Sequence, residues 1–131
     1  MRHVLVVDDA VLIRALLREI LRREGYAVHE AVGVRDALAR YREVRPDVVT
    51  LDLTLPDGSG TDCLAQLRDL DPGARVVVVT AASRDSAEAA LRQAGAAEFV
   101  AKPFRSEQVA DAVRRSLSAL PSLPTGNGEA R

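Results

Sequence analysis

Four short runs of β-branched and aliphatic residues recur along this chain, and they limit the folds that it can adopt. The runs are HVLVV (3–7), VVTL (48–51), RVVVVT (75–80) and EFVA (98–101). Continuous apolar runs of this length are typical of strands that are buried on both faces of a parallel sheet. A fifth segment, YAVHEA (26–31), alternates between apolar and polar residues, which favours a strand nearer the edge of that sheet.

Segments with helical periodicity separate these strands. In residues 10–24, apolar side chains recur three or four positions apart, at Leu12, Ile13, Leu16, Leu17 and Ile20. Gly25 is placed to end this helix. Further helices are expected over 34–44, 61–70, 85–94 and 106–119. Five strand–helix units predict an α/β sandwich, in which a parallel sheet carries helices on both faces through right-handed crossovers.

Length and composition place this sandwich in a single domain and exclude several classes of protein. The chain has 131 residues, enough for one domain over 1–120, and the Pro- and Gly-rich segment 121–131 is expected to be a disordered tail or a truncated linker. A net charge of −1 gives no field that favours nucleic acid or anionic membranes. The first apolar run is too short for a signal peptide or a membrane span. A single cysteine, Cys63, excludes an internal disulfide and fits the reducing cytoplasm.

Polar residues stand where the predicted strands end. Asp8 and Asp9 follow the first strand, Asp52 follows the third, Thr80 ends the fourth and Lys102 follows the fifth. Ligands of such sheets bind beyond the carboxyl ends of the strands. One acid after a strand has an equally good structural explanation as a helix N-cap, but five such residues at one edge favour a functional site.

Lys102 is the only lysine among 18 basic residues, and it directly precedes Pro103. An arginine-rich composition accounts for the scarcity of lysine, which makes the one retained lysine more informative. A compact ammonium on a flexible stem can enter a crowded site that does not accommodate the wide, forked guanidinium. The alternative is that Lys102 is an ordinary exposed charge.

These residue types suit phosphoryl chemistry on a carboxylate. Three neighbouring carboxylates repel one another, and a divalent cation relieves that repulsion. Ligand sets made only of oxygen favour Mg²⁺ over zinc or copper. A carboxylate can then attack phosphorus to form an aspartyl phosphate, with the phosphoryl oxygens neutralised by the cation, the Thr80 hydroxyl and Lys102.

Four segments, VVDDA, LDLTLPDGSG, VVTAA and EFVAKPF, occur in order at these strand ends. Over residues 3–119 the chain resembles the response-regulator receiver domain of two-component signalling, whose signature segments these match. The resemblance implies a flavodoxin-like fold with strand order 2-1-3-4-5, a cis Lys102–Pro103 bond, and a loop after the acceptor that Pro56 and Gly60 shape. It implies a signalling protein that is not an enzyme, phosphorylated by a sensor histidine kinase or a histidine phosphotransfer protein.

The same resemblance assigns roles to individual residues. Asp52 matches the phosphoacceptor, Asp9 a direct Mg²⁺ ligand, Asp8 a mainly water-mediated ligand, and Thr54 the residue whose backbone carbonyl binds the metal. The backbone N–H of Ala81 corresponds to a donor to the phosphoryl group. Switching and output are assigned to Thr80 and Phe99, and to a protein-binding face made by the fourth helix, the fifth strand and the fifth helix. Thr54 and Ala82 occupy positions that tune dephosphorylation.

Docking of the phosphoryl donor is expected at Ile13 and Pro103. Burial against the sheet is an equally good explanation for Ile13. Two histidines, His3 and His29, are interpreted as uncoupled surface or edge-strand residues. Cys63 is expected on a helix packed against the sheet, and Phe104 is expected to anchor packing after Pro103.

Two other functions remain open. The chain could be the receiver part of a larger regulator with a DNA-binding or enzymatic output domain, since 121–131 is compatible with a linker. It could also be a phosphohydrolase with an aspartyl nucleophile. Those enzymes carry the nucleophile on the first strand and a second acid two residues later, whereas the residue two positions after Asp52 is Thr54, so this function is disfavoured.

Overall fold

A computed structural model describes residues 1–81 and 84–118 of the protein. Its central feature is a parallel five-stranded sheet in the order β2-β1-β3-β6-β7. The strands are β1 (His3–Val7), β2 (Ala27–Ala31), β3 (Val48–Leu51), β6 (Val76–Thr80) and β7 (Glu98–Ala101). This is the predicted 2-1-3-4-5 order, and β2 lies at an edge as its alternating sequence indicated. Two predictions fall outside the described residues: the tail or linker over 121–131, and the position of Ala82 that tunes dephosphorylation.

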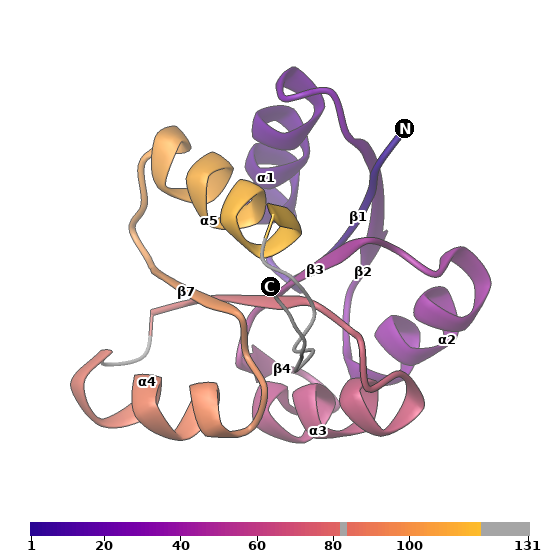
Figure 1. Ribbon diagram of the computed structural model, residues 1–131, viewed down its shortest axis with the longest axis vertical. Helices are drawn as coiled ribbons and strands as arrows, with labels where there is room; N and C mark the ends of the chain where they lie inside the picture. Colours follow the sequence, from indigo (N-terminus) through magenta and orange to yellow (C-terminus); the bar gives the residue numbers. More distant parts are fainter. Residues whose placement is uncertain (82–83, 119–131) are drawn as a thin grey trace, which may run out of the picture.

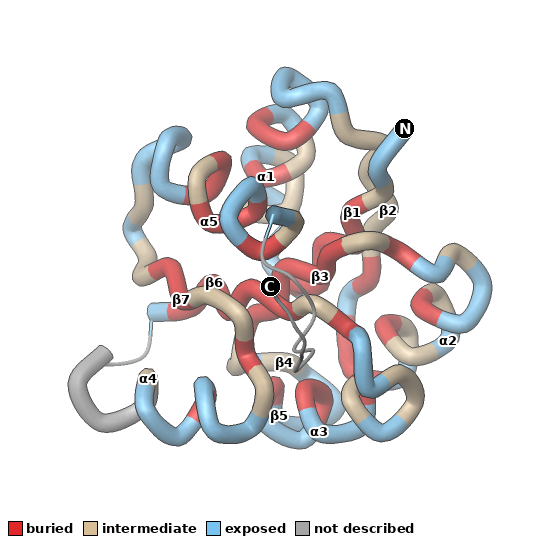
Figure 2. The backbone as a smooth tube through the Cα atoms, viewed as in Figure 1, coloured by how far each residue is buried: buried red, intermediate tan, exposed pale blue. Residues whose placement is uncertain are grey.

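Helices cover both faces of the sheet (Figure 1). They are α1 (Val11–Arg23), α2 (Val34–Val44), α3 (Gly60–Leu70), α4 (Arg84–Gln93) and α5 (Ser106–Ser118). One core cluster joins α1 and α5 to one face, and a second cluster joins α2, α3 and α4 to the other. Figure 2 shows the buried residues concentrated along the sheet between these two layers. Cys63 is fully buried on α3 in the second cluster, as predicted, and Phe104 packs partly against the first.

The exposed apolar residues of α1 differ from the prediction. Leu12 and Leu16 were placed in the buried stripe, but their exposed fractions are 83% and 46%. The buried residues are instead Leu17, Ile20 and Leu21. Each helical residue is rotated by about 100° from the next, so Leu12 and Leu16 lie one position away from the inward stripe. The sequence shows the period of this helix clearly, but its phase is set by the sheet beneath it.

A short antiparallel hairpin follows the third strand, and the sequence did not indicate it. It consists of β4 (Thr54–Leu55) and β5 (Gly58–Ser59), with Thr54 opposite Ser59. Gly60 ends the hairpin at a point where a Cβ atom would lie 2.3 Å from the Cα of Leu53. Only glycine permits this close approach of two backbone segments. The hairpin therefore depends on Gly60, consistent with the expectation that this glycine shapes the loop.

The two histidines contact each other, so the prediction that they are uncoupled is wrong. His3 Nδ1 lies 3.0 Å from His29 Nε2, and the rings stack with centroids 5.2 Å apart. The register pairs Leu5 with His29, and His3 precedes Leu5 by two residues on the same strand. Because side chains alternate between faces with a period of two, both rings lie on one face of the sheet. Single-residue reasoning could not reveal a contact that depends on strand register.

One polar side chain lies in the core without a hydrogen bond. Thr50, on β3, is 1% exposed, and its hydroxyl has no hydrogen-bond partner within the described parts of the chain.

Over the same described residues, no helix is both long and apolar enough to cross a bilayer.

Candidate functional site

Three carboxylates meet at the carboxyl edge of the sheet. One oxygen from each of Asp8, Asp9 and Asp52 lies within 4.8 Å of the others. Asp8 and Asp52 are buried, at 1% and 7% exposure, whereas Asp9 is exposed. Two of the acids are therefore buried, and the third is open to solvent. We call Asp8, Asp9 and Asp52 the acidic cluster.

The strand register explains why these acids meet. Val7 pairs with Leu51 across β1 and β3, so Asp8 and Asp52 are the next residues on two neighbouring strands. The ladder continues through them, because the Asp52 N–H donates to the Val7 carbonyl at 3.0 Å. Their backbone positions are thus fixed by the sheet rather than by a loop.

Lys102 reaches this cluster from the end of β7, the edge strand next to β6. Its Nζ lies 2.8 Å from Asp8 Oδ2 and 3.4 Å from Asp52 Oδ2. The side chain begins after β7 and crosses the end of β6, and its backbone N–H donates to the Thr80 carbonyl at 2.8 Å. The Lys102–Pro103 peptide bond is cis, as the resemblance implied. Only 17% of the Lys102 side chain is exposed, so the interpretation as an ordinary surface charge does not hold.

Hydrogen bonds orient both buried carboxylates. Asp8 Oδ1 accepts from the Ala10 N–H at 2.9 Å, which leaves Oδ2 to Lys102. Asp52 Oδ1 accepts from the Thr54 N–H at 3.3 Å. The N-cap residue of α1 is Ala10, and no side chain caps that helix end. Asp9 therefore does not act as the N-cap, which was the structural alternative for it.

The other predicted site residues lie around this group. Thr80 ends β6 and is 1% exposed, and Ala81 follows it at the surface. Thr54 is exposed at the start of the hairpin. Phe99 on β7 is 6% exposed and packs in the core cluster with α2, α3 and α4. The Phe99 residue is therefore buried, and its role in switching stays a prediction.

The predicted docking residues have different surroundings. Ile13 is half-buried and packs against the cluster beneath α1 and α5, which fits the alternative of burial. Pro103 is exposed. The first turns of α1 instead expose Val11 and Leu12, at 67% and 83%, and Leu16. Sequence reasoning missed Leu12 and Leu16 because it assigned them to the inward stripe, and it did not consider Val11.

A further residue that sequence reasoning missed is Asp57, in the turn of the hairpin. Asp57 Oδ1 accepts from the Val34 N–H at 2.7 Å, and Oδ2 accepts from the Arg35 N–H at 3.1 Å. These backbone hydrogen bonds lower the pKa of the Asp57 carboxyl. A Cβ atom on Gly33 would lie 2.5 Å from Asp57 Oδ1, so the carboxylate can approach only because Gly33 has no side chain. Asp57 thereby attaches the hairpin after Asp52 to the start of α2.

The geometry can be compared with known proteins. The family model described as the response regulator receiver domain matches residues 4–114. The chain belongs to this family. As a receiver domain, it is a component of two-component signalling.

Individual relatives cover most of this receiver domain. Chemotaxis protein CheY of Thermotoga maritima is 36% identical over 115 residues, covering 87% of this chain and 96% of that protein. The probable transcriptional regulatory protein TcrX of Mycobacterium tuberculosis is 42% identical over 106 residues, covering 81% of this chain but 45% of TcrX. A crystal structure of a CheX–CheY complex from Borrelia burgdorferi, containing BeF₃ and Mg²⁺, superimposes with a TM-score of 0.83 at 30% identity, covering 86% of each chain.

The donor set of the receiver domain fits a hard divalent cation. The acidic cluster offers carboxylate oxygens and no histidine or thiol ligand. Mg²⁺ takes oxygen ligands and commonly binds through one or two carboxylates while keeping several waters. The exposed position of Asp9 leaves one side of the cluster open for such waters.

Proposed function

We propose that this receiver domain is a phosphoacceptor response regulator in which Asp52 accepts a phosphoryl group from a phosphohistidine. The donor is a sensor histidine kinase or a histidine phosphotransfer protein. The observation that carries the proposal is the position of Asp52, buried between two further acids and the ammonium of Lys102 at 3.4 Å. An acid that served only the fold would not require two carboxylates beside it.

The residues that would hold Mg²⁺ are the acidic cluster and the backbone carbonyl of Thr54. When bound, the ion supplies positive charge that offsets the carboxylates and the phosphoryl oxygens. The donor set and the open side of the cluster support this assignment.

The protein's own residues position the reacting groups. The Thr54 N–H holds Asp52 Oδ1, so the carboxylate is oriented before a donor arrives. A carboxylate oxygen of Asp52 forms a bond to phosphorus while the phosphorus–nitrogen bond of the phosphohistidine breaks, and the electron pair returns to the imidazole. Lys102, the Thr80 hydroxyl and the Ala81 N–H then bind phosphoryl oxygens. Lys102 can do so by turning from Asp8, which it contacts at 2.8 Å.

The donor must approach the open side of the acidic cluster, where α1 begins. Val11, Leu12 and Leu16 form an exposed apolar strip there. We assign helix packing of the donor to this strip, with Ile13 supporting it from below and Pro103 at the other side of the site. Burying these side chains on association is favourable, because exposed apolar surface leaves water.

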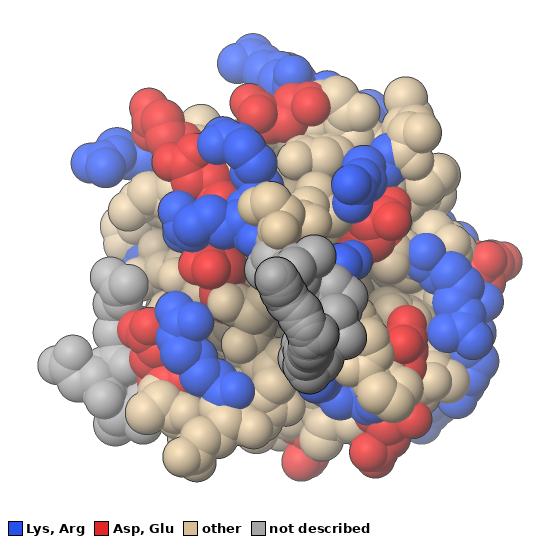
Figure 3. Space-filling view, in the orientation of Figure 1, with Lys and Arg blue, Asp and Glu red and all other residues tan. Residues whose placement is uncertain are grey.

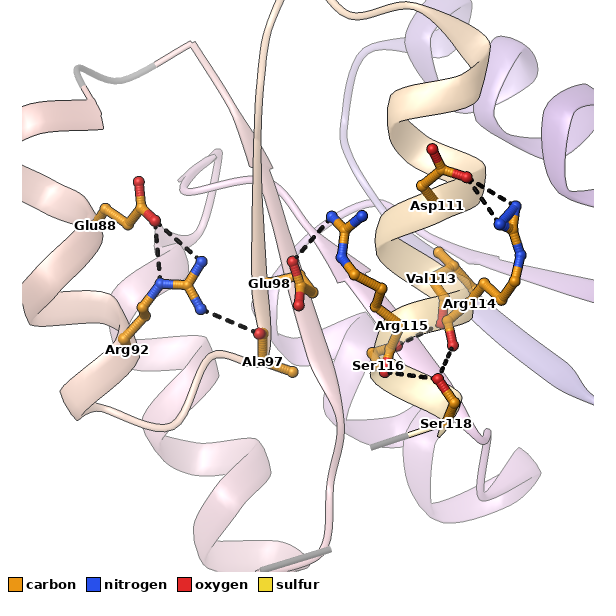
Figure 4. A network of polar contacts seen from close by, with 10 residues as sticks. All are labelled: Glu88, Arg92, Ala97, Glu98, Asp111, Val113, Arg114, Arg115, Ser116 and Ser118. Carbon is orange, nitrogen blue, oxygen red and sulfur yellow. Dashed lines mark hydrogen bonds and ion pairs between the residues drawn. The ribbon is translucent and has the colours of Figure 1, made fainter. Parts of the chain in front are cut away.

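Output is assigned to the face made by α4, β7 and α5, where a downstream protein would bind. Figure 4 shows its polar network, with Glu88 beside Arg92, Glu98 beside Arg115, and Asp111 beside Arg114. A groove on this face is lined by Phe99, Ala101, Pro103 and Arg115, among others. Movement of Phe99, coupled to Thr80 at the neighbouring strand end, would alter the floor of this groove and so transmit phosphorylation.

The network suits a protein rather than a nucleic acid. Its acids and bases alternate, and Figure 3 shows both signs interspersed over the same side of the molecule. Nucleic-acid binding generally requires a basic surface. We infer that the target is a protein and that the domain does not insert into a membrane. The domain is proposed to span residues 1–120.

A second candidate function is supported by one comparison. The match to TcrX covers less than half of that regulator, so domains of this kind also occur within longer proteins. Residues 121–131 would then be the start of a linker to an output domain. The proposed chemistry at Asp52 is the same in both cases.

The experiment that tests the phosphoacceptor is labelling by acetyl phosphate with Mg²⁺. We expect one phosphoryl group per chain by intact-mass analysis, stable in acid and lost in base, and none on Asp52→Asn. Equal labelling of the variant would refute the assignment. Continuous release of inorganic phosphate at many turnovers per minute would instead support the phosphohydrolase.

A further inference from the structure

A pair of histidines, a residue type that often binds metals, lies at the opposite end of β1 from the acidic cluster. His3 begins β1 and Asp8 directly follows it, roughly 16 Å away along an extended strand. His3 Nδ1 and His29 Nε2 approach to 3.0 Å. Both residues are half-buried.

The separation of the two nitrogens matches that of ligands sharing one ion. Zinc–nitrogen bonds are about 2.0–2.1 Å long, which places two nitrogens of a tetrahedral site about 3.3 Å apart. The observed 3.0 Å therefore requires a movement of a few tenths of an ångström, together with a tilt of the rings so that both lone pairs face one point. A half-buried imidazole can tilt in this way without displacing the strand that carries it.

The backbone around the pair is already held in place. β1 and β2 pair from His3 to Val7, and the His3 N–H donates to Asp47 Oδ2 at 2.7 Å. Burial and the neighbouring His3 lower the pKa of His29. His3 Nδ1 and His29 Nε2 share a hydrogen bond, so one of them carries a proton, and that proton must move to the other nitrogen of its ring when both bind an ion. Little conformational entropy has to be lost on binding, because the two ligands are on paired strands.

Nearby charges permit a cation here. Glu43 and Arg40, on α2, both act on His29, with opposite effects. They form an ion pair at 2.7 Å, so their charges offset each other beside the histidines. The Glu43 side chain is 65% exposed and can rotate to supply a carboxylate, while water can fill the remaining positions.

We propose that His3 and His29 form a second metal site that takes an imidazole-preferring transition ion such as Zn²⁺ and does not take Mg²⁺. Imidazole suits Zn²⁺, whereas Mg²⁺ prefers oxygen, so the two ends of β1 select different ions. An ion at this site cross-links β1 to β2 and stabilises the folded state by mass action. The inference does not rest on phosphoryl transfer at Asp52.

The test is isothermal titration calorimetry with ZnCl₂ on the full chain, in Mg²⁺ sufficient to compete at the acidic cluster. We expect one Zn²⁺ per chain. Losing an outer partner of a metal ligand already costs about 10–100-fold in affinity, so His3→Gln and His29→Gln should each weaken binding at least tenfold. Glu43→Gln reports on the third ligand. Glu19→Gln is its matched control, because Glu19 is also an exposed glutamate paired with an arginine on its own helix.

The outcome that overturns the proposal is unchanged Zn²⁺ affinity in His29→Gln, because the ion would then bind elsewhere. Nuclear magnetic resonance of the unmutated protein gives an independent answer if a variant does not fold. Zn²⁺ should shift the ring-nitrogen signals of both His3 and His29 at equal occupancy. A shift of only one histidine, or of neither, would also refute a shared site.

Discussion

Replacing Thr50 by valine should make the protein more stable. Thr50 pairs with Val6 on β1 and with Val77 on β6, in the centre of the sheet. Both neighbours belong to the apolar cluster beneath α1 and α5. The Thr50 hydroxyl is therefore surrounded by apolar groups, and it has no hydrogen-bond partner among the residues that the structure describes.

The magnitude follows from the cost of burying a hydroxyl. Protein mutational data put the cost of burying such a group without a hydrogen bond at about 1–3 kcal/mol. Valine keeps the β-branched shape and nearly the same volume, so no cavity forms and strand propensity is retained. We expect the free energy of unfolding to rise by about 1–2 kcal/mol for Thr50→Val. With an unfolding entropy near 2 cal/mol/K per residue, the melting temperature should rise by about 4–8 °C.

Urea denaturation followed by far-ultraviolet circular dichroism measures this change, and the slope with urea should stay the same. Val49→Thr is a suitable comparison, since it places a hydroxyl in the fully buried adjacent position on the other face and should destabilise the fold. If Thr50→Val left stability unchanged or lowered it, the hydroxyl would have a partner in solution. The reasoning from an unsatisfied group would then be wrong.

Three further substitutions test the site and the core. Lys102→Arg keeps the charge but not the compact shape, so Asp52 should still be labelled by acetyl phosphate. The active fraction should fall roughly tenfold or more, read from the nuclear magnetic resonance signals of Phe99 with and without beryllofluoride. Tyr41→Phe removes the 2.7 Å hydrogen bond to Asp71 that lowers the pKa of that carboxyl. It should cost about 1.5 kcal/mol at pH 7 by urea denaturation. Leu12→Asp should slow transfer from a donor kinase without affecting labelling by acetyl phosphate.

Each substitution has a result that would contradict its argument. Full beryllofluoride shifts in Lys102→Arg would mean that charge alone suffices. For Tyr41→Phe, the Asp71 carboxyl is ionised above its unfolded pKa and loses this stabilisation as pH falls through its lower folded pKa. The cost of the substitution must therefore shrink as the pH falls below the ordinary aspartate pKa, and an unchanged cost in acid would exclude a charged acceptor. Slowed acetyl-phosphate labelling in Leu12→Asp would indicate damage to the site or fold rather than to docking.

The five strands and the meeting of Asp8, Asp52 and Lys102 could be predicted, because they follow from local patterns and a general rule. Apolar runs mark buried strands, and the carboxyl ends of parallel strands share one edge. The resemblance to receiver domains added the order of strands. These signals need no knowledge of which side chain faces which neighbour.

The features that escaped prediction depend on register, phase or distant partners. The contact of His3 with His29 requires the exact pairing of β1 with β2. Exposure of Leu12 depends on the rotation of α1 relative to the sheet. Asp57 binds backbone N–H groups more than 20 residues away in sequence. For Thr50, the decisive fact is the lack of a partner across the described residues, which no local sequence pattern encodes.

The short strand β1 has a consequence for folding accuracy. It has five residues, from His3 to Val7, with neighbours on both sides. Side chains alternate along a strand, so a slip of one residue against β2 and β3 would turn every side chain to the opposite face. Such a slip would part His3 from His29 and, at the same time, withdraw Asp8 from Asp52 and Lys102. A misregistered chain would thus lose both groups of ligands together, and titrating the two ends with different ions would count the correctly paired molecules in a preparation.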